Sequence, residues 1–311
     1  MIETSDGETS TAPRRIGVMY DRDLPPEGLA DFAREVEAGG ADDLWLVEDL
    51  RWAGSIASAA TALAATRMLR VGIGITPAPL RNPALLAMEL AALARIHPGR
   101  LVAGIGHGVP EWMEQVGAGT PHRLALLKET MDAVRALLRG EEVTLHGRVV
   151  HLDGVRLVHP PREVPPVIAG VIGPRSLELS GRVADGTLIV EGRGPDEVLG
   201  IRALIEKGRA DADTGAGVAG EKPHMLLIFT HLCIDEDTEK ARAALAPIVA
   251  DYSELLGIAP QDVFTVSGSP ADVAARVRSL WQAGIDTVIL RPVGERPAQQ
   301  FVRAVAAVRE H

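Results

Sequence analysis

The pattern of hydrophobic and polar positions divides the chain into short apolar runs that alternate with longer amphipathic segments. A run that is apolar at every position predicts a strand buried on both faces. Apolar residues spaced three or four positions apart predict a helix with one buried face. We expect strands at 15–20, 44–47, 69–75, 101–105, 165–169, 186–190, 225–234 and 287–290. We expect helices at 27–39, 55–66, 83–95, 123–139, 174–183, 195–212, 238–250, 270–284 and 297–310.

The alternation of strand and helix predicts an α/β fold with a parallel sheet. Its extent over almost the whole chain favours a (β/α)8 TIM barrel with insertions. An open, doubly wound sheet is the alternative, but it would need a glycine-rich phosphate loop after the first strand. The residues after Tyr20 are D-R-D-L-P-P-E-G-L, which contain no such loop. Gly104, Gly106 and Gly108 do not supply it later, because Val109 stands where the dinucleotide fingerprint has its third glycine.

Some segments interrupt the alternation or lie outside it. Residues 142–158 alternate polar and apolar positions around an H-G-R turn and predict a β-hairpin insertion. Residues 252–266 are irregular and could form a second insertion, and residues 215–222 predict a flexible loop. Residues 1–13 are polar and acidic without the apolar core of a signal peptide, so we expect a disordered leader. A single domain is expected over residues 14–311.

The stretch from Val71 to Pro83, V-G-I-G-I-T-P-A-P-L-R-N-P, begins as a strand and ends with three prolines. Proline has no amide donor and a fixed φ, so we expect the strand ladder to stop at Ile75 and a stiff loop to follow. Gly72 and Gly74 remove side chains where the strand ends, which would let a flat ligand lie against the backbone. A proline-rich connector without a ligand is the alternative interpretation.

Composition and charge narrow the classes of partner. The 311 residues carry a formal net charge of −10, and the lysines and arginines form no basic run, so nucleic acid and anionic membranes are poor partners. No run of about eighteen apolar residues predicts a membrane span. The single cysteine, Cys233, excludes a disulfide framework and favours a cytoplasmic location. The alanine-rich segments 57–65 and 84–94 could pack against a second subunit in a homodimer, or simply against the barrel.

In a barrel, the loops that follow the carboxyl ends of the strands build the active site. Glu48 and Asp49 follow the second strand, and they would point to opposite sides if that strand continued. A carboxylate at the barrel mouth can act as a general acid or base, and Asp49 is the stronger candidate. A helix cap or a solvated loop charge is the alternative for both residues.

Two further strand ends offer proton donors or acceptors. After the third strand, Thr76 is the only side-chain donor. After the fourth strand come Gly106, His107 and Gly108. The two glycines would let a ligand ring sit close while the imidazole donates or accepts a proton. A histidine with a purely structural role is the alternative.

The fifth strand is followed by a glycine-containing turn that enters a helix at Pro174. Free backbone amides and the positive end of the helix dipole suit a phosphate there, and an ordinary helix start is the alternative. Arg291, which leaves the last strand, is a further candidate cation but could equally pair with a local carboxylate. The candidate residues of the turn are Ala169, Gly170, Val171, Gly173, Pro174, Arg175 and Ser176.

The sequence shows neither a metal-binding motif nor a catalytic nucleophile. The nine histidines lack H-E-x-x-H or comparable spacing, and no G-x-S-x-G elbow is present. A pocket with acid–base groups and an anion site, but without a nucleophile, indicates that the reactivity comes from a bound cofactor and is directed at a small-molecule substrate.

Five motifs, in order, resemble those of the bacterial-luciferase-like flavin and deazaflavin oxidoreductases. The resemblance covers about residues 15 to 308 and is greatest to the branch that depends on coenzyme F420, a deazaflavin. That branch includes methylene-tetrahydromethanopterin reductase, which the chain resembles most, and F420-dependent glucose-6-phosphate dehydrogenase. The motifs are A-D-D-L-W-L-V-E-D (41–49), G-I-T-P-A-P-L-R-N-P-A (74–84), G-R-L-V-A-G-I-G-H-G (99–108), V-P-P-V-I-A-G-V-I-G-P-R-S-L-E-L-S-G-R-V-A-D-G (164–186) and S-G-S-P-A-D-V-A-A-R-V-R (267–278).

The resemblance implies a (β/α)8 barrel that holds the cofactor in its mouth. It implies a non-prolyl cis peptide at Gly74–Ile75, with the Gly74 backbone behind the cofactor ring and Thr76 facing the ring. It also identifies the turn from Gly170 to Ser176 as the phosphate-binding turn.

Around the second and fourth strands, the chain both follows and departs from the family pattern. Glu48 and Asp49 stand where family members place an acid and a histidine or second acid. Trp52 matches a tryptophan of the sugar-phosphate dehydrogenase branch. That branch has a histidine where this chain has Asp49, and a glutamate where it has Val109, with Glu111 two positions later. These departures argue against the sugar-phosphate reaction.

The resemblance favours a coenzyme F420-dependent oxidoreductase that transfers hydride between the cofactor and a C=C, C=N or alcohol carbon of a small substrate. Asp49, or alternatively His107, would exchange the proton. An FMN-dependent monooxygenase of the same fold and a non-catalytic flavin-binding relative are the alternatives. The loops at 142–158 and 251–266, which would select the substrate, carry no recognisable signature.

Overall fold

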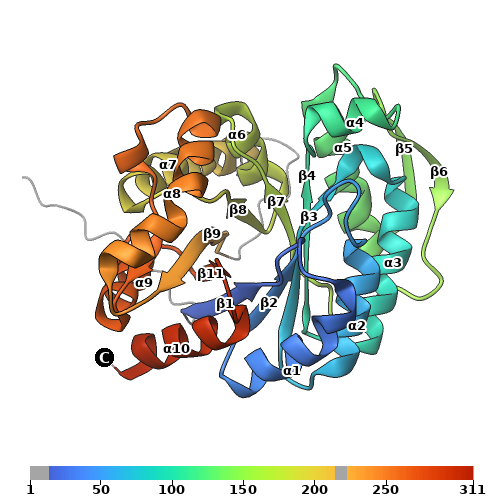
Figure 1. The fold of residues 1–311 in the computed structure, drawn as a ribbon. Helices are drawn as coiled ribbons and strands as arrows, with labels where there is room; N and C mark the ends of the chain where they lie inside the picture. Colours follow the sequence, from blue (N-terminus) through green and yellow to red (C-terminus); the bar gives the residue numbers. More distant parts are fainter. Residues whose placement is uncertain (1–13, 214–222, 311) are drawn as a thin grey trace, which may run out of the picture.

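Eight parallel strands close into a barrel in the computed structural model, which describes residues 14–213 and 223–310 (Figure 1). The barrel strands are β1 (Arg15–Met19), β2 (Asp43–Leu46), β3 (Arg70–Pro77), β4 (Leu101–Gly106), β7 (Val167–Gly170), β8 (Gly186–Ile189), β9 (Met225–Ile234) and β11 (Thr287–Pro292). They are hydrogen-bonded in the order β9, β11, β1, β2, β3, β4, β7 and β8, and β8 pairs back to β9. This closed ring confirms the (β/α)8 prediction. The expected leader and the loop expected at 215–222 lie outside the described residues.

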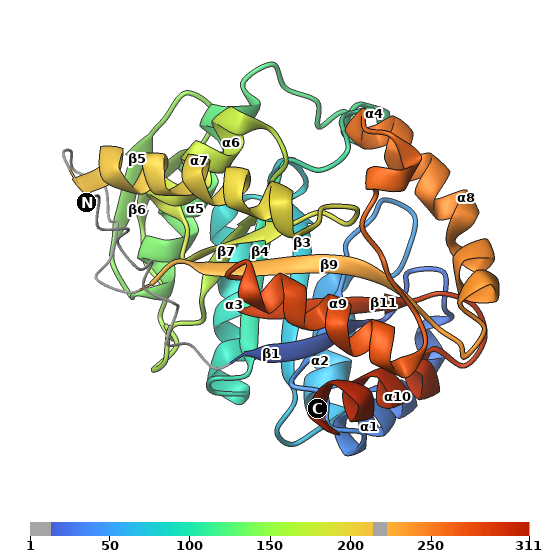
Figure 2. The ribbon, with the colours of Figure 1, turned by 90° about the vertical axis from the view of Figure 1, so that its left-hand side faces the viewer.

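Helices surround the barrel, and Figure 2 shows those of the carboxyl-terminal half on its outer side. They form where the sequence predicts them because their apolar positions recur with helical spacing; in the first helix these positions are Leu29, Phe32, Ala33 and Val36, all buried. The helices are α1 (Leu29–Ala38), α2 (Ser55–Ala65), α3 (Pro83–Ile96), α5 (Arg123–Leu138), α6 (Pro174–Val183), α7 (Pro195–Asp213), α8 (Thr238–Leu256), α9 (Pro270–Gln282) and α10 (Pro297–Glu310). Among the described residues, no helix has both the length and the apolar character needed to cross a bilayer.

The two predicted insertions have different outcomes. The expected hairpin is present as β5 (Val143–His146) and β6 (His151–Val155), which pair antiparallel. The segment expected to be irregular instead continues α8 to Leu256 and then forms β10 (Val266–Gly268), which pairs parallel with the end of β9. β9 is ten residues long and reaches beyond the ring, so its free edge accepts this short extra strand.

Short helical elements complete the chain. The six-residue helix α4 (Pro110–Gln115), which the sequence analysis does not predict, follows β4 at the barrel mouth. Single turns of 3-10 helix lie at Pro26–Gly28, Ala78–Leu80 and Pro260–Asp262. These turns are too short to show a hydrophobic periodicity, which is why the sequence pattern does not reveal them.

Large side chains fill the barrel interior. They pack against glycines, whose lack of a side chain leaves room for them. The rings of Trp45 on β2 and Phe229 on β9 meet edge to face with centroids 5.9 Å apart. A Cβ added at Gly72 would lie 2.4 Å from Trp45, and one added at Gly74 would lie 2.7 Å from Leu188. The glycines of β3 therefore make room for the protein's own core, and support of a ligand ring by the Gly74 backbone stays a prediction.

The amino-terminal ends of β1, β2 and β3 are joined by a buried ion-pair cluster. Asp43 is fully buried and accepts hydrogen bonds from Arg15 Nη2 at 2.7 Å and from Arg70 Nη2 at 2.7 Å. Both guanidinium Nε atoms also donate to the same carboxylate. Because this cluster lies at the end of the barrel opposite the mouth, it fixes three neighbouring strands without contributing to the site.

Candidate active site

The end of β3 carries the most unusual backbone feature of the described chain. The peptide bond between Gly74 and Ile75 is cis, as the family resemblance implies, and the register with β4 shifts between Ile73 and Thr76. The strand does not stop at Ile75, contrary to the sequence expectation, because Thr76 and Pro77 pair with the last residues of β4. Proline is tolerated there because it occupies the last position of the strand.

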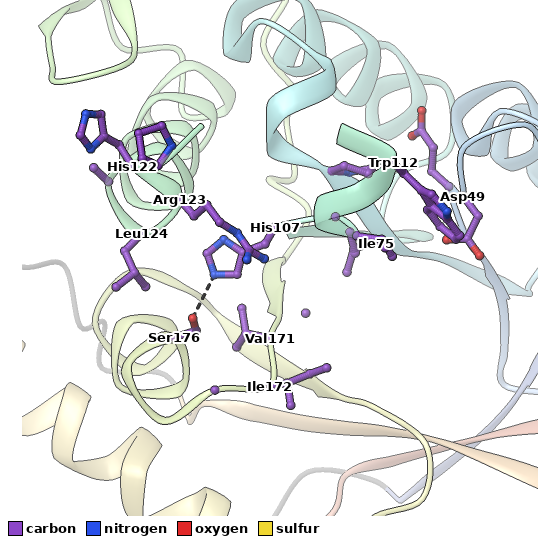
Figure 3. A pocket seen from close by; sticks show the side chains of 18 of the residues that line it. Asp49, Ile75, His107, Trp112, His122, Arg123, Leu124, Val171, Ile172 and Ser176 are labelled. Carbon is purple, nitrogen blue, oxygen red and sulfur yellow. Dashed lines mark hydrogen bonds between the residues drawn. The ribbon is translucent and has the colours of Figure 1, made fainter. Parts of the chain in front are cut away.

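Ile75 projects into the barrel mouth, and glycines of two neighbouring strands accommodate it (Figure 3). A Cβ added at Gly170 would lie 2.2 Å from Ile75 Cγ2, and one added at Gly106 would lie 3.0 Å from Ile75 Cδ1. Thr76 is only 1% exposed and does not line the cavity, so the prediction that it faces a ligand is not supported by its position. Side chains alternate along a strand, and Ile75 and Pro77 take the mouth side.

A cavity of about 730 Å³ occupies the mouth above Ile75. This volume suits a ligand with several rings. Figure 3 shows Asp49 on one side of Ile75, and Arg123 on the other side beside His107. The lining residues are Glu48, Asp49, Ile75, Pro77, His107, Gly108, Val109, Trp112, Pro121, His122, Arg123, Leu124, Ala125, Arg148, Gly170, Val171, Ile172, Gly173 and Ser176.

Both carboxylates after β2 line the cavity, and each is paired with an arginine. Glu48 forms an ion pair with Arg81 and also accepts a hydrogen bond from the Ser55 hydroxyl at 2.6 Å. Asp49 forms an ion pair with Arg22 from the loop after β1. The two side chains do not separate to opposite sides, because β2 ends at Leu46 and the alternation of a strand no longer applies to them.

An aromatic pair holds the arginine that binds Asp49. The guanidinium carbon of Arg22 lies 4.4 Å from the ring centroid of Trp52 and 5.9 Å from that of Trp112. The two indole rings are 6.0 Å apart, and Trp52 Nε1 donates to Asp23 Oδ1 at 2.9 Å. Trp112 lines the cavity whereas Trp52 does not, so Trp52 acts on the cavity through Arg22.

His107 and Ser176 meet across the mouth. The imidazole Nε2 lies 2.9 Å from the Ser176 hydroxyl oxygen, and both residues line the cavity. Burial, reinforced by the positive charge of Arg123, lowers the pKa of His107 to about 4. The imidazole is therefore neutral near pH 7, and a neutral imidazole has one nitrogen that donates and one that accepts a proton.

The predicted phosphate turn is only partly exposed to the main cavity. Gly170, Val171, Gly173 and Ser176 line it, whereas Ala169 is fully buried inside β7. Pro174 and Arg175 lie outside this cavity, and Arg175 lines a neighbouring one. Gly173 caps α6 without a side-chain hydrogen bond, and a Cβ added there would meet nothing within 4 Å. The turn is thus open at the helix start, and anion binding there stays a prediction.

Arg291 is not part of the cavity lining but belongs to a buried ion-pair cluster. Its Nε lies 2.7 Å from Asp21 Oδ2, and its Nη1 lies 3.3 Å from Glu191 Oε1. Burial alone would lower the pKa of Arg291, but the two carboxylates raise it above its usual value. The structure therefore supports pairing with local carboxylates, the alternative that the sequence analysis left open for Arg291.

The two arginines that line the cavity, Arg123 and Arg148, are not among the predicted site residues. Arg123 begins α5, and Arg148 lies in the turn of the β5–β6 hairpin, so the two come from distant parts of the sequence. Trp112 from α4 is likewise not among the predicted residues, although it stands only four positions after Gly108. The H-G-R turn was a visible signal for Arg148, but the turn could not be placed at the mouth without the tertiary structure.

Comparison with known proteins yields relatives along nearly the whole chain. The model of the family described as luciferase-like monooxygenase matches residues 9–287. A 5,10-methylenetetrahydromethanopterin reductase of Methanolobus tindarius is 26% identical over 89% of this chain and 94% of the relative. An F420-dependent glucose-6-phosphate dehydrogenase of Kineococcus radiotolerans is 27% identical over 93% of this chain and 94% of the relative. The solved structure of the coenzyme F420 dependent tetrahydromethanopterin reductase from Methanopyrus kandleri has a TM-score of 0.84 at 20% identity, over 96% of this chain and 99% of that chain, and has the same fold.

Proposed function

The chain belongs to the luciferase-like monooxygenase family, and we propose that it is an oxidoreductase that uses coenzyme F420 to transfer hydride to or from a small organic substrate. The observation that carries this proposal is the cavity above Ile75, which is lined by two carboxylates, the imidazole of His107 and two arginines. The names of the relatives in Methanolobus and Kineococcus support the choice of cofactor. The departures at Val109 and Asp49 speak against a sugar phosphate as the substrate.

The cavity fits a flat ring system with an anionic side chain. Ile75, Val109 and Trp112 provide apolar surface for the ring, and the open turn at Gly173 would accept a phosphate group near the start of α6. When bound, the deazaflavin supplies a ring carbon that gives or accepts hydride. The protein's own contribution is to position the ring, exclude water and manage the proton.

Two side chains that line the cavity can donate or accept that proton. Asp49 is held by Arg22, which keeps the carboxylate oriented at the end of the cavity near Trp112 (Figure 3). His107 is neutral near pH 7 and is oriented by Ser176. We favour Asp49 as the residue that exchanges a proton with the substrate, and His107 as the residue that donates to or accepts from the ring edge.

Titration of the purified protein with coenzyme F420 and, separately, with FMN tests the choice of cofactor. We expect coenzyme F420 to bind with quenching of its fluorescence. The oxidised cofactor should then be reduced by a secondary alcohol, or the chemically reduced cofactor should be oxidised by an enone or imine. Binding and oxygen-dependent turnover with FMN alone would instead identify a flavin monooxygenase. Binding of either cofactor without turnover, unchanged in Asp49→Asn, would identify a non-catalytic relative.

The proposed homodimer would use the outer face of α3. Leu85, Met88 and Ile96 are 57%, 56% and 70% exposed on this helix, which is more apolar surface than a solvated helix face needs. Light scattering should give twice the mass of the 33.0 kDa chain. Replacing Leu85 and Met88 by Glu should return the protein to a monomer, and a wild-type monomer at micromolar concentration would refute the dimer.

A further inference from the structure

A second cavity lies beside the main one. It has a volume of about 420 Å³ and shares Leu124 and Ala125 with the cavity in the mouth. Both shared residues belong to the start of α5, and the second cavity lies between this helix and α6. The outer cavity is therefore adjacent to the mouth, with Leu124 and Ala125 at the boundary between the two cavities.

Cationic side chains follow the two cavities from the mouth to the outside. Arg123 and Arg148 line the inner cavity, and Lys128, Arg175 and Arg182 line the outer one. In the described ranges, no carboxylate forms an ion pair with Arg123, Arg148 or Arg175. Three arginines without an ion-pair partner in the described ranges are notable in a chain with a formal net charge of −10.

The carboxylates near this row do not cancel it. Glu178 lines the outer cavity, but its Oε1 accepts a hydrogen bond from Lys207 Nζ at 2.7 Å. Lys128 and Arg182 have carboxylate partners, Asp132 at 2.6 Å and Asp211 at 3.5 Å. These are exposed pairs, which are weak in water and can rearrange when a stronger anion arrives. The lining of the outer cavity therefore carries three cationic side chains and one carboxylate, Glu178.

We infer that the α5–α6 groove, defined by Arg123, Lys128, Arg148, Arg175 and Arg182, binds an elongated polyanion that is attached to a ring in the mouth. The chemical class that fits is a chain of a phosphodiester and successive carboxylates. This inference rests on the proposed function, because coenzyme F420 carries such an acidic tail beyond its ribityl side chain. The groove then contributes to affinity by charge pairing, while the mouth recognises the ring.

The test compares two ligands whose rings are the same. One is coenzyme F420 with its oligoglutamate tail, and the other is its precursor, which has the ring and ribityl group but neither phosphate nor glutamates. Dissociation constants are measured by quenching of deazaflavin fluorescence between about 50 and 500 mM NaCl. We expect the tailed ligand to bind more tightly at low salt and to weaken as salt rises, whereas the binding of the tail-less ligand should change little.

Matched variants locate the effect in the groove. Lys128→Gln with Arg182→Gln removes two positive charges from the outer groove, and Lys240→Gln with Arg242→Gln removes two from the exposed start of α8. Because the groove variant removes two exposed charges, it should raise the dissociation constant of the tailed ligand about 3- to 30-fold. The dissociation constant of the tail-less ligand should stay within about twofold of the wild-type value. The α8 variant should bind both ligands as the wild type does.

The outcomes separate this inference from the proposed function. If the tail-less ligand binds but the tail adds neither affinity nor salt dependence, the inference is wrong and the proposed function stands. If the α8 variant weakens the tailed ligand as much as the groove variant, the effect is one of net charge and the inference is also wrong. If neither ligand binds, the proposed function falls and the inference with it.

Discussion

The imidazole Nε2 of His107 lies 2.9 Å from the hydroxyl oxygen of Ser176, and this contact joins the loop after β4 to the first turn of α6 across the barrel mouth (Figure 3). The residues are 69 positions apart in the sequence. The contact sets the orientation of the imidazole, and burial sets its charge.

The first prediction concerns the titration of this imidazole. Because burial and Arg123 lower the pKa of His107 to about 4, a nuclear magnetic resonance titration should show its midpoint well below the usual value near 6.5. The resonance is assigned by its loss in His107→Gln. Arg123→Gln removes the second cause and should move the midpoint upward, though not to 6.5, because burial remains. A wild-type midpoint near 6.5 would contradict the described burial of the ring.

The second prediction is a loss of stability in weak acid. Burial lowers the pKa of His107, His224 and His231 to about 4 each, whereas the unfolded chain takes up a proton on histidine near pH 6.5. Between these values the unfolded state binds more protons, so stability falls as pH drops from about 6.5 toward 4. Each histidine should cost about 2 kcal/mol by pH 5, measured by urea unfolding at pH 7.5 and pH 5. His224→Asn should reduce the dependence of the unfolding free energy on pH. An unchanged dependence would show that His224 does not contribute to it.

The third prediction tests how the glycines accommodate Ile75. Gly170→Ala would place a Cβ 2.2 Å from Ile75 Cγ2 and should destabilise the protein by about 1–3 kcal/mol through overpacking. Adding Ile75→Ala removes the clashing atom, so the double variant should lose less stability than the two single variants together. Thermal unfolding in a double-mutant cycle measures this coupling. Strict additivity would show that the two side chains do not meet.

The fourth prediction concerns the buried carboxylate at the opposite end of the barrel. Asp43→Asn leaves Arg15 and Arg70 facing a neutral amide inside the protein and should cost about 3–5 kcal/mol of unfolding free energy. Asp31→Asn is the control, because Asp31 is 88% exposed and pairs with Arg34 on the surface of α1. Its effect should stay within about 0.5 kcal/mol. Equal effects of the two substitutions in urea unfolding would refute the role of Asp43.

The fifth prediction concerns catalysis by Asp49. Asp49→Asn retains the shape of the side chain but removes its ability to exchange a proton, so turnover with an accepted substrate should fall about 10²- to 10⁴-fold. The dissociation constant of coenzyme F420 should change only a few-fold. Arg22→Gln should give a smaller loss, because it frees Asp49 without removing the carboxylate. Full activity of Asp49→Asn would show that Asp49 does not exchange the proton, and would favour His107 for that role.

The strand ends could be predicted from the sequence because their signals are local. Val71 to Pro83 was recognised by its glycines and prolines, and the cis bond at Gly74–Ile75 followed from the family resemblance. Glu48 and His107 were identified because each directly follows an apolar run, and both line the cavity. The role of an individual side chain within these loops is harder to predict from the sequence, as the buried position of Thr76 shows.

The sequence by itself determined the alternation of strands and helices, and with it the closed barrel and the end at which the site lies. Apolar periodicity indicates which face of each segment is buried, and it can be recognised within a short window of the chain. The tertiary structure pairs Arg291 with Asp21 and Glu191, and it places Arg123 and Arg148 in the lining of one cavity. Closing the ring brings the first and last strands together, and no periodicity along the chain records which charges then become partners.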